Sequence, residues 1–272
     1  MQDFQTFFVA HEAMIRLACF IVLLMFFLLL EIKWPRRVLE SGLRNRQLNN
    51  LSLLIMNSLA ARIFVPLATF ELALFTARND MGLFNLLALP FVVNIVFTII
   101  VFDLLIYIQH VVFHQVRALW RIHRVHHTDI HFDVTTGVRF HPIEIVLSLF
   151  YKLLAVFLLG PAALGIILYE VLLNSAALFT HSNITLNKNV DRVLRIVFVT
   201  PDMHRVHHST IRTETDSNYG NLFSCWDRLF KTYKSKPAAG YDNMEIGLDD
   251  FRDRSSGQLL QLLKITFFIF FC

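Results

Sequence analysis

Histidine is the residue type that could do chemistry in this chain, because it is concentrated in three short blocks. The segment HRVHH occurs twice, at residues 123–127 and 204–208, and HVVFH covers residues 110–114. The chain has 12 histidines among 272 residues. At that frequency, chance would place an HxxHH pattern in it only about 0.02 times. Two copies and an additional HxxxH therefore indicate a functional requirement.

The spacing of these histidines determines which of them can act together. Positions i, i+3 and i+4 of an α-helix share one face, so each HxxHH block would present three imidazoles together. Neutral imidazole is a good ligand for iron, zinc and copper. Eight such ligands are too many for one metal ion, since zinc is usually satisfied by about four. The blocks therefore predict two metal ions, held by His110, His114, His123, His126, His127, His204, His207 and His208.

The remaining histidines carry weaker signals. His181 in FTHSN ends an apolar stretch, and we predict it as a ninth metal ligand. His141 in RFHPIE could join the site, but the proline after it also makes it a helix-start signal. His131 is left open in the same way. His11 is predicted to lie on the other side of the membrane as an ordinary interfacial residue.

The elements that position the histidines are predicted to be membrane helices. Hydrophobic residues make up 55% of the chain, charged residues 17%, and the mean hydropathy is +0.52. A typical soluble domain has about 25% charged residues. The fold class predicted is all-α: an integral membrane bundle of about 4–5 membrane helices with a cytoplasmic helical cap that holds a histidine-rich dimetal site.

Three predicted spans precede the first histidine block, at residues 14–32, 51–76 and 85–109, and 77–84 connects the last two on the outside. A helical hairpin follows at about 143–180, interrupted by GPAALG at 160–165. The loop at 33–50 is rich in cations and has Glu40 as its acid, so the positive-inside rule places it in the cytoplasm. Its cations are Lys33, Arg36, Arg37, Arg44 and Arg46.

This topology puts the histidines from 110 to 208 on the cytoplasmic face of a multi-pass membrane protein. The net charge of +4 fits cytoplasmic loops, and no basic run is long enough to follow phosphates, so nucleic acid is not expected as a partner. The first span follows an acidic N-terminus without a basic n-region, which we interpret as a retained span and not a signal peptide.

Three regions are predicted along the chain: an N-terminal transmembrane region at 1–100, a catalytic domain at 101–235 that includes the hairpin, and a C-terminal tail at 236–272. The tail ends in LLQLLKITFFIFFC, 14 residues that are too short to span a membrane and are expected to form an interfacial or packed helix. Cys19, Cys225 and Cys272 are far apart, which disfavours a disulfide or a thiolate metal site.

Six segments that together cover about half the chain carry a family resemblance: DLLIYIQHVVFH (103–114), LWRIHRVHHTD (119–129), RFHPIE (139–144), THSNI (180–184), TPDMHRVHH (200–208) and NYGNLFSCWDRLFKTY (218–233). Through these segments the sequence resembles the fatty acid hydroxylase and sterol desaturase superfamily of membrane di-iron oxygenases. It departs from many members at Val111, where Arg is common, and at Lys231, where Gly often follows WDRLF. It also has no HPGG-type cytochrome b5 segment.

The resemblance implies an enzyme with two non-haem iron ions and O2 as co-substrate. Its substrate would be a membrane lipid (fatty acyl, sterol or related), which it would hydroxylate or desaturate. Redox metal chemistry is needed because side chains alone cannot oxidise an alkyl chain. No flavin, haem or nicotinamide motif is visible, so a separate electron donor is implied: a reductase, ferredoxin or cytochrome.

A metal-bound histidine usually donates its other N–H to an acceptor. The candidate acceptors are Asp103, Asp129, Asp202 and Asp227, each of which could also be a helix cap or a loop charge. Tyr219 and Trp226 are expected to pack the cap. Arg121, Arg124 and Arg205 are expected to pair with lipid headgroups or with those aspartates.

Three other classes of protein compete with this interpretation. A metal transporter would place histidines along a path through several spans. A haem-b electron carrier would bury histidine pairs in facing spans, for which clustered HxxHH blocks are wasteful. A zinc protease is disfavoured because HExxH is absent.

Overall fold

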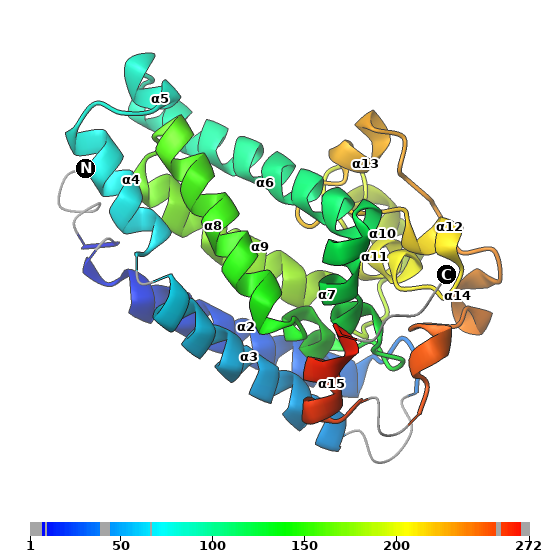
Figure 1. The fold of residues 1–272 in the computed structure, drawn as a ribbon. Helices are drawn as coiled ribbons and strands as arrows, with labels where there is room; N and C mark the ends of the chain where they lie inside the picture. Colours follow the sequence, from blue (N-terminus) through cyan, green and yellow to red (C-terminus); the bar gives the residue numbers. More distant parts are fainter. Residues whose placement is uncertain (1–6, 9, 39–43, 66, 254–256, 268–272) are drawn as a thin grey trace.

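The computed structural model describes the chain except for residues 1–6, 9, 39–43, 66, 254–256 and 268–272, and Figure 1 shows its arrangement. Within the described part, regular structure is helical, and β-pairing is limited to isolated bridges such as Pro35 with Ile184. The predicted all-α class is therefore confirmed.

Five long helices lie side by side as a bundle (Figure 1). Helix α9 is the central one: it packs against α2 and α6, while α8 packs against α3. Half of the apolar window of α9 is buried, against 6% for α2. The helices are α2 (Glu12–Lys33), α3 (Arg44–Phe64), α6 (Phe91–Gln115), α8 (Pro142–Leu159) and α9 (Ala163–Thr180).

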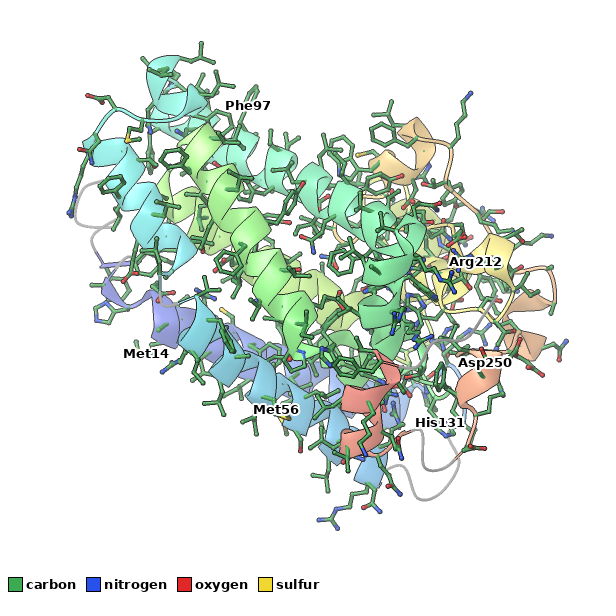
Figure 2. The ribbon with its side chains drawn as sticks, in the orientation of Figure 1. Met14, Met56, Phe97, His131, Arg212 and Asp250 are labelled. Carbon is green, nitrogen blue, oxygen red and sulfur yellow. The ribbon has the colours of Figure 1, made fainter. Side chains whose placement is uncertain are left out.

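The outer surface of this bundle is apolar. On α2, Val22 and Leu29 are more than half exposed, and Figure 2 shows Met14, Met56 and Phe97 spread along the bundle surface. Such a surface suits contact with lipid, because soluble proteins rarely expose large apolar patches. Five segments of the described chain are long and apolar enough to cross a membrane, namely α2, Arg44–Leu86, α6, α8 and α9. This agrees with the predicted number of membrane helices.

Two predicted spans have different bounds in the structure. The expected span at 51–76 is two helices: α3 begins already at Arg44, and α4 (Thr69–Arg78) follows a break. The described residues of this break are 65, 67 and 68, and the sequence between them contains a proline, a residue type that disfavours helix interiors because it lacks the N–H. The expected span at 85–109 begins later, at Phe91 after Pro90, and α5 (Leu83–Leu86) precedes it. It also extends to Gln115, so the HVVFH block belongs to this long helix.

The predicted hairpin is confirmed as α8 and α9, which turn at Gly160. Gly160 has a φ of +63° and lies against Gly82, whose φ is +86°. A Cβ on Gly82 would lie 2.3 Å from the Gly160 nitrogen, so both positions need glycine.

A cap of short elements covers the end of the bundle where α6 and α9 end, and the labels of His131, Arg212 and Asp250 mark it in Figure 2. Its elements are α7 (Arg117–His127), η1 (Val134–Val138), α10 (Lys188–Leu194), α11 (Pro201–His207), α12 (Arg212–Thr215), α13 (Cys225–Leu229), α14 (Gly240–Asn243), η2 (Asp249–Phe251) and α15 (Leu259–Ile265).

The cationic segment that follows α2 is bound to this cap. Arg36 pairs with Asp202 and Asp242, and Arg37 donates to the carbonyls of Tyr241 and Met244. These arginines are therefore structural contacts as well as loop charges. Glu40 lies outside the described residues.

The C-terminal helix α15 is packed, as expected of a segment too short to span. Leu262 and Ile265 are buried in it. Arg121 donates from Nε to the carbonyl of Thr266 at 3.1 Å, and Arg124 donates to that of Ile265. These two arginines thus bind the end of α15. Residues 268–272, including Cys272, lie outside the described part of the chain.

Candidate metal centre

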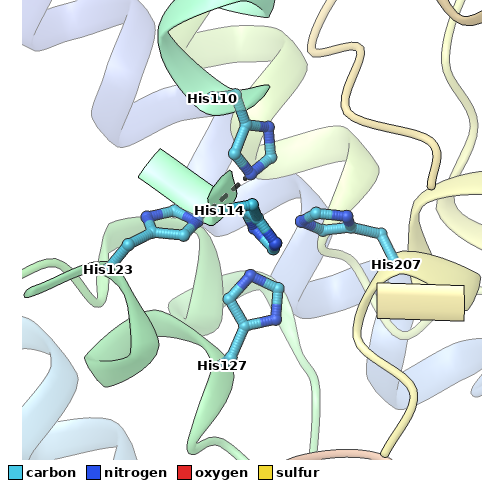
Figure 3. A group of neighbouring side chains, drawn as sticks. All are labelled: His110, His114, His123, His127 and His207. Carbon is cyan, nitrogen blue, oxygen red and sulfur yellow. Dashed lines mark hydrogen bonds between the residues drawn. The ribbon is translucent and has the colours of Figure 1, made fainter. Parts of the chain in front are cut away.

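The nine histidines predicted as ligands are all brought together at the junction of bundle and cap, in two groups. The ligand nitrogens within each group lie within 4.8 Å of one another. The first histidine group, drawn in Figure 3, contains His110, His114, His123, His127 and His207. The second histidine group contains His126, His181, His204 and His208.

Each HxxHH block divides its histidines between the two groups. In α7, His123 and His127 are i and i+4 and belong to the first group, while His126 belongs to the second. The second block is reversed: His204 and His208 belong to the second group and His207 to the first. The middle histidine of each block thus belongs to the group that contains the two outer histidines of the other block. This arrangement requires α7 and α11 to face each other.

The two groups are direct neighbours. The rings of His127 and His208, one from each group, are stacked with centroids 4.5 Å apart. Helix α6 adds His110 and His114 to the first group, and His181, at the C-cap of α9, completes the second. The arrangement can place two metal ions side by side at the end of the bundle. It does not form a path of histidines along several spans, as a metal transporter would need.

Backbone carbonyls fix the orientation of three of these imidazoles. The Nδ1 of His110 lies 2.8 Å from the carbonyl oxygen of Tyr219, and that of His207 lies 2.7 Å from the carbonyl oxygen of Ser217. His181 makes the same contact with Ala177 at 2.7 Å. A carbonyl oxygen only accepts, so Nδ1 carries the proton in each and Nε2 keeps the lone pair that a metal needs.

Two carboxylates do the same for histidines of the first group. Glu144 in α8 accepts from Nδ1 of His123 at 2.8 Å, and Asp216 accepts from Nδ1 of His114 at 3.2 Å. Neither acceptor was singled out from the sequence. Glu144 had a usable signal, because it is the one acid in a largely apolar helix, and such residues mark functional sites.

The four aspartates predicted as acceptors were the wrong ones: in the structure their recorded partners are other groups. Asp103 accepts from the indole of Trp226 at 2.8 Å and from two backbone N–H groups, and Asp227 accepts from the N–H of Tyr219 at 2.8 Å. These two carboxylates hold the 219–226 segment, whose Tyr219 carbonyl in turn orients His110. These two aspartates therefore support the imidazole of His110 indirectly, through the backbone, and do not accept from a ring nitrogen themselves.

The other two aspartates bind arginines. Asp129 pairs with Arg46 of α3, which holds its pKa well below the usual range although burial acts against this. Asp202 pairs with Arg36 and with Arg205, which confirms the predicted aspartate pairing for Arg205. Both carboxylates are close to histidine blocks in the sequence, but in the structure they pair with arginines.

The metal-facing nitrogens fit a metal because protein groups leave them unpaired. In the first group, the Nε2 atoms of His114, His127 and His207 are buried with no hydrogen-bond partner. In the second, both ring nitrogens of His208 are in this state. The remaining contacts are between imidazoles, such as Nε2 of His110 with Nε2 of His123 at 3.1 Å (Figure 3). Buried unpaired polar atoms are costly, and a cation at each group would satisfy them.

The cap keeps its histidines in the neutral form that binds metals. Burial lowers the pKa of His181 to about 4 and that of His207 to about 3. Burial lowers the pKa of His126, His204 and His208 in the same direction. At neutral pH no proton therefore competes with a metal for these nitrogens.

Other histidines lie outside both groups. His141 is the N-cap of α8, where its Nδ1 accepts from the N–H of Ile143 at 3.2 Å, so the helix-start interpretation holds. His131 is not in either group. Two aromatic residues back the first group: Tyr219 has its ring 5.1 Å from that of His114, and Trp120 lies 4.8 Å from the same ring. Tyr219 was expected to pack, whereas nothing in the sequence singled out Trp120.

A cavity of about 380 Å³ opens from the histidines into the bundle. Much of its wall is apolar, with Phe113, Phe140 and Leu149 among the lining residues. The histidines that line it come from both groups, namely His110, His123, His126, His181 and His204. An alkyl chain in this cavity would reach both groups from the membrane side.

A helical bundle with helices long and apolar enough to cross a membrane carries, at one end, two histidine groups that could hold metal ions, and comparison with known proteins gives its family. The family model for fatty acid hydroxylases matches residues 95–232, which is half of the chain and includes the nine histidines. The chain therefore belongs to the fatty acid hydroxylase family, within the superfamily that the sequence resembled.

Curated relatives match over about half of the chain. The ornithine lipid hydroxylase OlsE of Rhizobium tropici is 30% identical over 149 residues, which cover 54% of this chain and 44% of that protein. The human alkylglycerol monooxygenase is 30% identical over 128 residues, or 47% of this chain and 27% of that protein. The match thus spans less than half the length of these relatives. No solved structure matches the chain.

Proposed function

We propose that this chain is a membrane-bound oxidoreductase that hydroxylates a membrane lipid, with one iron ion in each histidine group. The observation that carries the proposal is the junction of two buried, metal-ready histidine groups with an apolar cavity inside a membrane bundle. The relatives named as a lipid hydroxylase and as monooxygenases favour hydroxylation over desaturation.

The reaction class determines what the protein must supply. Insertion of one oxygen atom of O2 into a C–H bond, with the other leaving as water, consumes two electrons and two protons. Bound iron would supply the redox chemistry for O2 and the C–H bond, which side chains lack. The first group would hold its ion through five imidazoles and the second through four.

The chain's own residues perform the remaining tasks. Glu144 and Asp216 orient histidines of the first group, and the Ala177 carbonyl orients His181. Phe113 and Phe140 form apolar cavity wall beside the histidines, which excludes bulk water from the reacting carbon.

The electron donor is proposed to be a separate protein, a reductase, ferredoxin or cytochrome, that approaches the cap. The cap is assigned to the cytoplasmic face, because the cations of the 33–46 segment lie at this end of the bundle. Residues 101–235 are proposed as the catalytic domain, with 1–100 as a membrane region that packs against it and 236–272 as a tail that closes the cap.

Metal analysis tests the two-ion site. The purified chain is expected to contain about two irons, as two histidine groups require. His127→Ala removes a ligand of the first group and His126→Ala one of the second, and each is expected to lower the iron content and abolish lipid oxidation. Protein that binds no iron after reconstitution, together with a fully active His207→Ala variant, would rule out the proposal.

Lipid analysis tests the reaction. Lipid extracts from cells that lack or express the chain are compared by mass spectrometry. A gain of one oxygen in one lipid class identifies hydroxylation, whereas a loss of two hydrogens would show desaturation instead.

A further inference from the structure

The cavity has a second polar end, away from the histidines. Arg16 of α2, Lys152 of α8 and Glu170 of α9 all line it. Arg16 Nη1 forms an ion pair with one carboxylate oxygen of Glu170 at 2.9 Å, and Lys152 lies 3.5 Å from the other oxygen of the same carboxylate. Thr69 also donates to Glu170, at 2.7 Å. We call Arg16, Lys152 and Glu170 the charged cluster.

The charged cluster lies within the bundle and at a fixed distance from the site. Glu170 precedes His181 by eleven residues on α9, which corresponds to about 16 Å along the helix axis. Lys152 follows Glu144 by eight residues on α8, or about 12 Å. Charged side chains are costly inside a membrane bundle, and those found there usually mark a functional site.

The charged cluster has more hydrogen-bond donors than the protein uses. A guanidinium offers about five N–H donors and an ammonium about three. Among the described contacts, Arg16 uses only Nη1, for Glu12 and Glu170, and Lys152 pairs with Glu170 alone. Counted with Glu12, which also pairs with Arg16, two cations face two carboxylates, so their charges balance. The surplus is N–H groups on Arg16 and Lys152, which line a cavity whose remaining wall is largely apolar.

We propose that the charged cluster binds the anionic oxygens of a lipid end group, a carboxylate or a phosphate, while the alkyl chain extends along the cavity to the histidines. This inference rests on the proposed function for the fate of the chain but not for its binding. Arg16 and Lys152 provide charge-assisted hydrogen bonds to the anion, and Glu170 is the carboxylate that competes with the anion for both cations. The separation between the charged cluster and the histidines then sets which carbon of the chain is oxidised.

Binding of three matched probes tests this inference. Palmitate, hexadecyl phosphate and hexadecanol share one alkyl chain and differ in the end group. Each is titrated into the purified chain in detergent under nitrogen, so that no turnover occurs. At least one of the two anionic probes is expected to bind about tenfold more tightly than hexadecanol, because the free energy of one charge-assisted hydrogen bond corresponds to about this ratio of affinities. Comparing palmitate with the phosphate identifies the anion.

Two variants that should change anion affinity in opposite directions separate a binding role of the charged cluster from a structural role. Lys152→Met is expected to remove the preference for the anionic probe, and Lys152→Arg to keep it. Glu170→Gln removes the competing carboxylate and is expected to raise affinity for the anion. Arg62→Met, at an exposed cation on α3, serves as the control with unchanged affinities. A folding check by thermal unfolding accompanies each variant.

Two outcomes would overturn the inference: equal affinity for acid, phosphate and alcohol, or a parallel loss of anion affinity in Lys152→Met and Glu170→Gln. Either could occur in a chain that still binds iron and oxidises lipid, which would leave the proposed function intact. Conversely, selective anion binding by a chain that holds no iron would support the inference and count against the proposed function.

Discussion

The imidazoles at this site are oriented by groups that are distant in sequence. His123 relies on Glu144 in another helix, and His114 relies on Asp216, which is 102 residues away. Asp216 contacts Nδ1 of His114, whose Nε2 is unpaired. Glu144 contacts Nδ1 of His123, whose Nε2 faces that of His110. An imidazole held in this way keeps both its tautomer and its direction before a metal arrives.

Replacing Glu144 by Leu is expected to weaken metal binding at the first histidine group. His123 then has no acceptor for Nδ1–H, and loss of such an acceptor typically costs about 10–100-fold in metal affinity. The amount of iron that the chain retains against a series of chelators of increasing iron affinity measures the effect. Glu144→Gln should lose less, because its amide oxygen still accepts. Asp202→Asn is the control, since Asp202 pairs with arginines, and an equal loss there would contradict the assignment.

The sequence predicted which histidines come together, but it did not predict which groups accept from their Nδ1–H. The HxxHH and HxxxH spacings identified eight histidines because helical periodicity puts them on shared faces. The division of each block between two groups could not be predicted, since it depends on how α7 and α11 face each other. The aspartates beside the blocks were natural candidates, but Asp129 turns to Arg46 and Asp202 to Arg36.

Among the elements, the short helix η1 controls how closely the cap approaches α9. Gly137 of η1 lies against the C-terminal turn of α9: a Cβ there would be 2.8 Å from the carbonyl oxygen of Ala177 and 3.3 Å from Nδ1 of His181. That carbonyl is the acceptor that orients His181. The glycine is needed for the close approach, because any side chain would push this carbonyl away.

Gly137→Ala is therefore expected to damage both stability and the second histidine group. Overpacking of this kind typically costs about 1–3 kcal/mol. Thermal unfolding in detergent measures the first effect and iron content the second. Gly257→Ala is the matched control, because a Cβ there meets nothing within 4 Å. A Gly137→Ala chain with unchanged iron content would show that this carbonyl does not need its present position.

Element existence was easier to predict from sequence than element bounds. Apolar runs identified all five long helices, and GPAALG located the turn between α8 and α9. The predicted bounds were wrong where a helix contains polar residues. Helix α3 begins at Arg44 because Arg46 and Asn50 bind Asp129 where the bundle meets the cap. Hydropathy cannot show such a segment, since its polar side chains are buried by partners that come much later in the chain.

For the whole molecule, the burial of neutral histidines couples stability to pH. The pKa of His181 falls to about 4 and that of His207 to about 3 in the fold, whereas their ordinary value is 6.5. Between these values the unfolded chain binds more protons than the folded one. Stability therefore rises with pH in this interval and is lost as the pH falls.

The metal-free chain should accordingly unfold more easily as the pH is lowered from 6.5 toward 4. Unfolding midpoints after iron removal by a chelator measure this dependence. His181→Gln, which has no imidazole to protonate at that position, should show a shallower slope. A midpoint that stays constant across this interval would contradict the picture of buried, neutral imidazoles.

The orientation of the bundle in the membrane can be tested through its exposed cysteine. Cys225 lies at the start of α13 in the cap, whereas Arg78 ends α4 at the opposite end of the bundle (Figure 1). In a chain with Cys19 and Cys272 replaced by Ser, a membrane-impermeant maleimide should label Cys225 in inside-out vesicles only.

A second chain completes this test. With the three native cysteines replaced by Ser and Arg78→Cys introduced, labelling should occur only in right-side-out vesicles. This result is expected because the cations at the cap end, such as Arg36 and Arg37, resist transfer across the membrane. The reverse pattern would place the histidines on the outer face, and the electron donor would then have to act from that side.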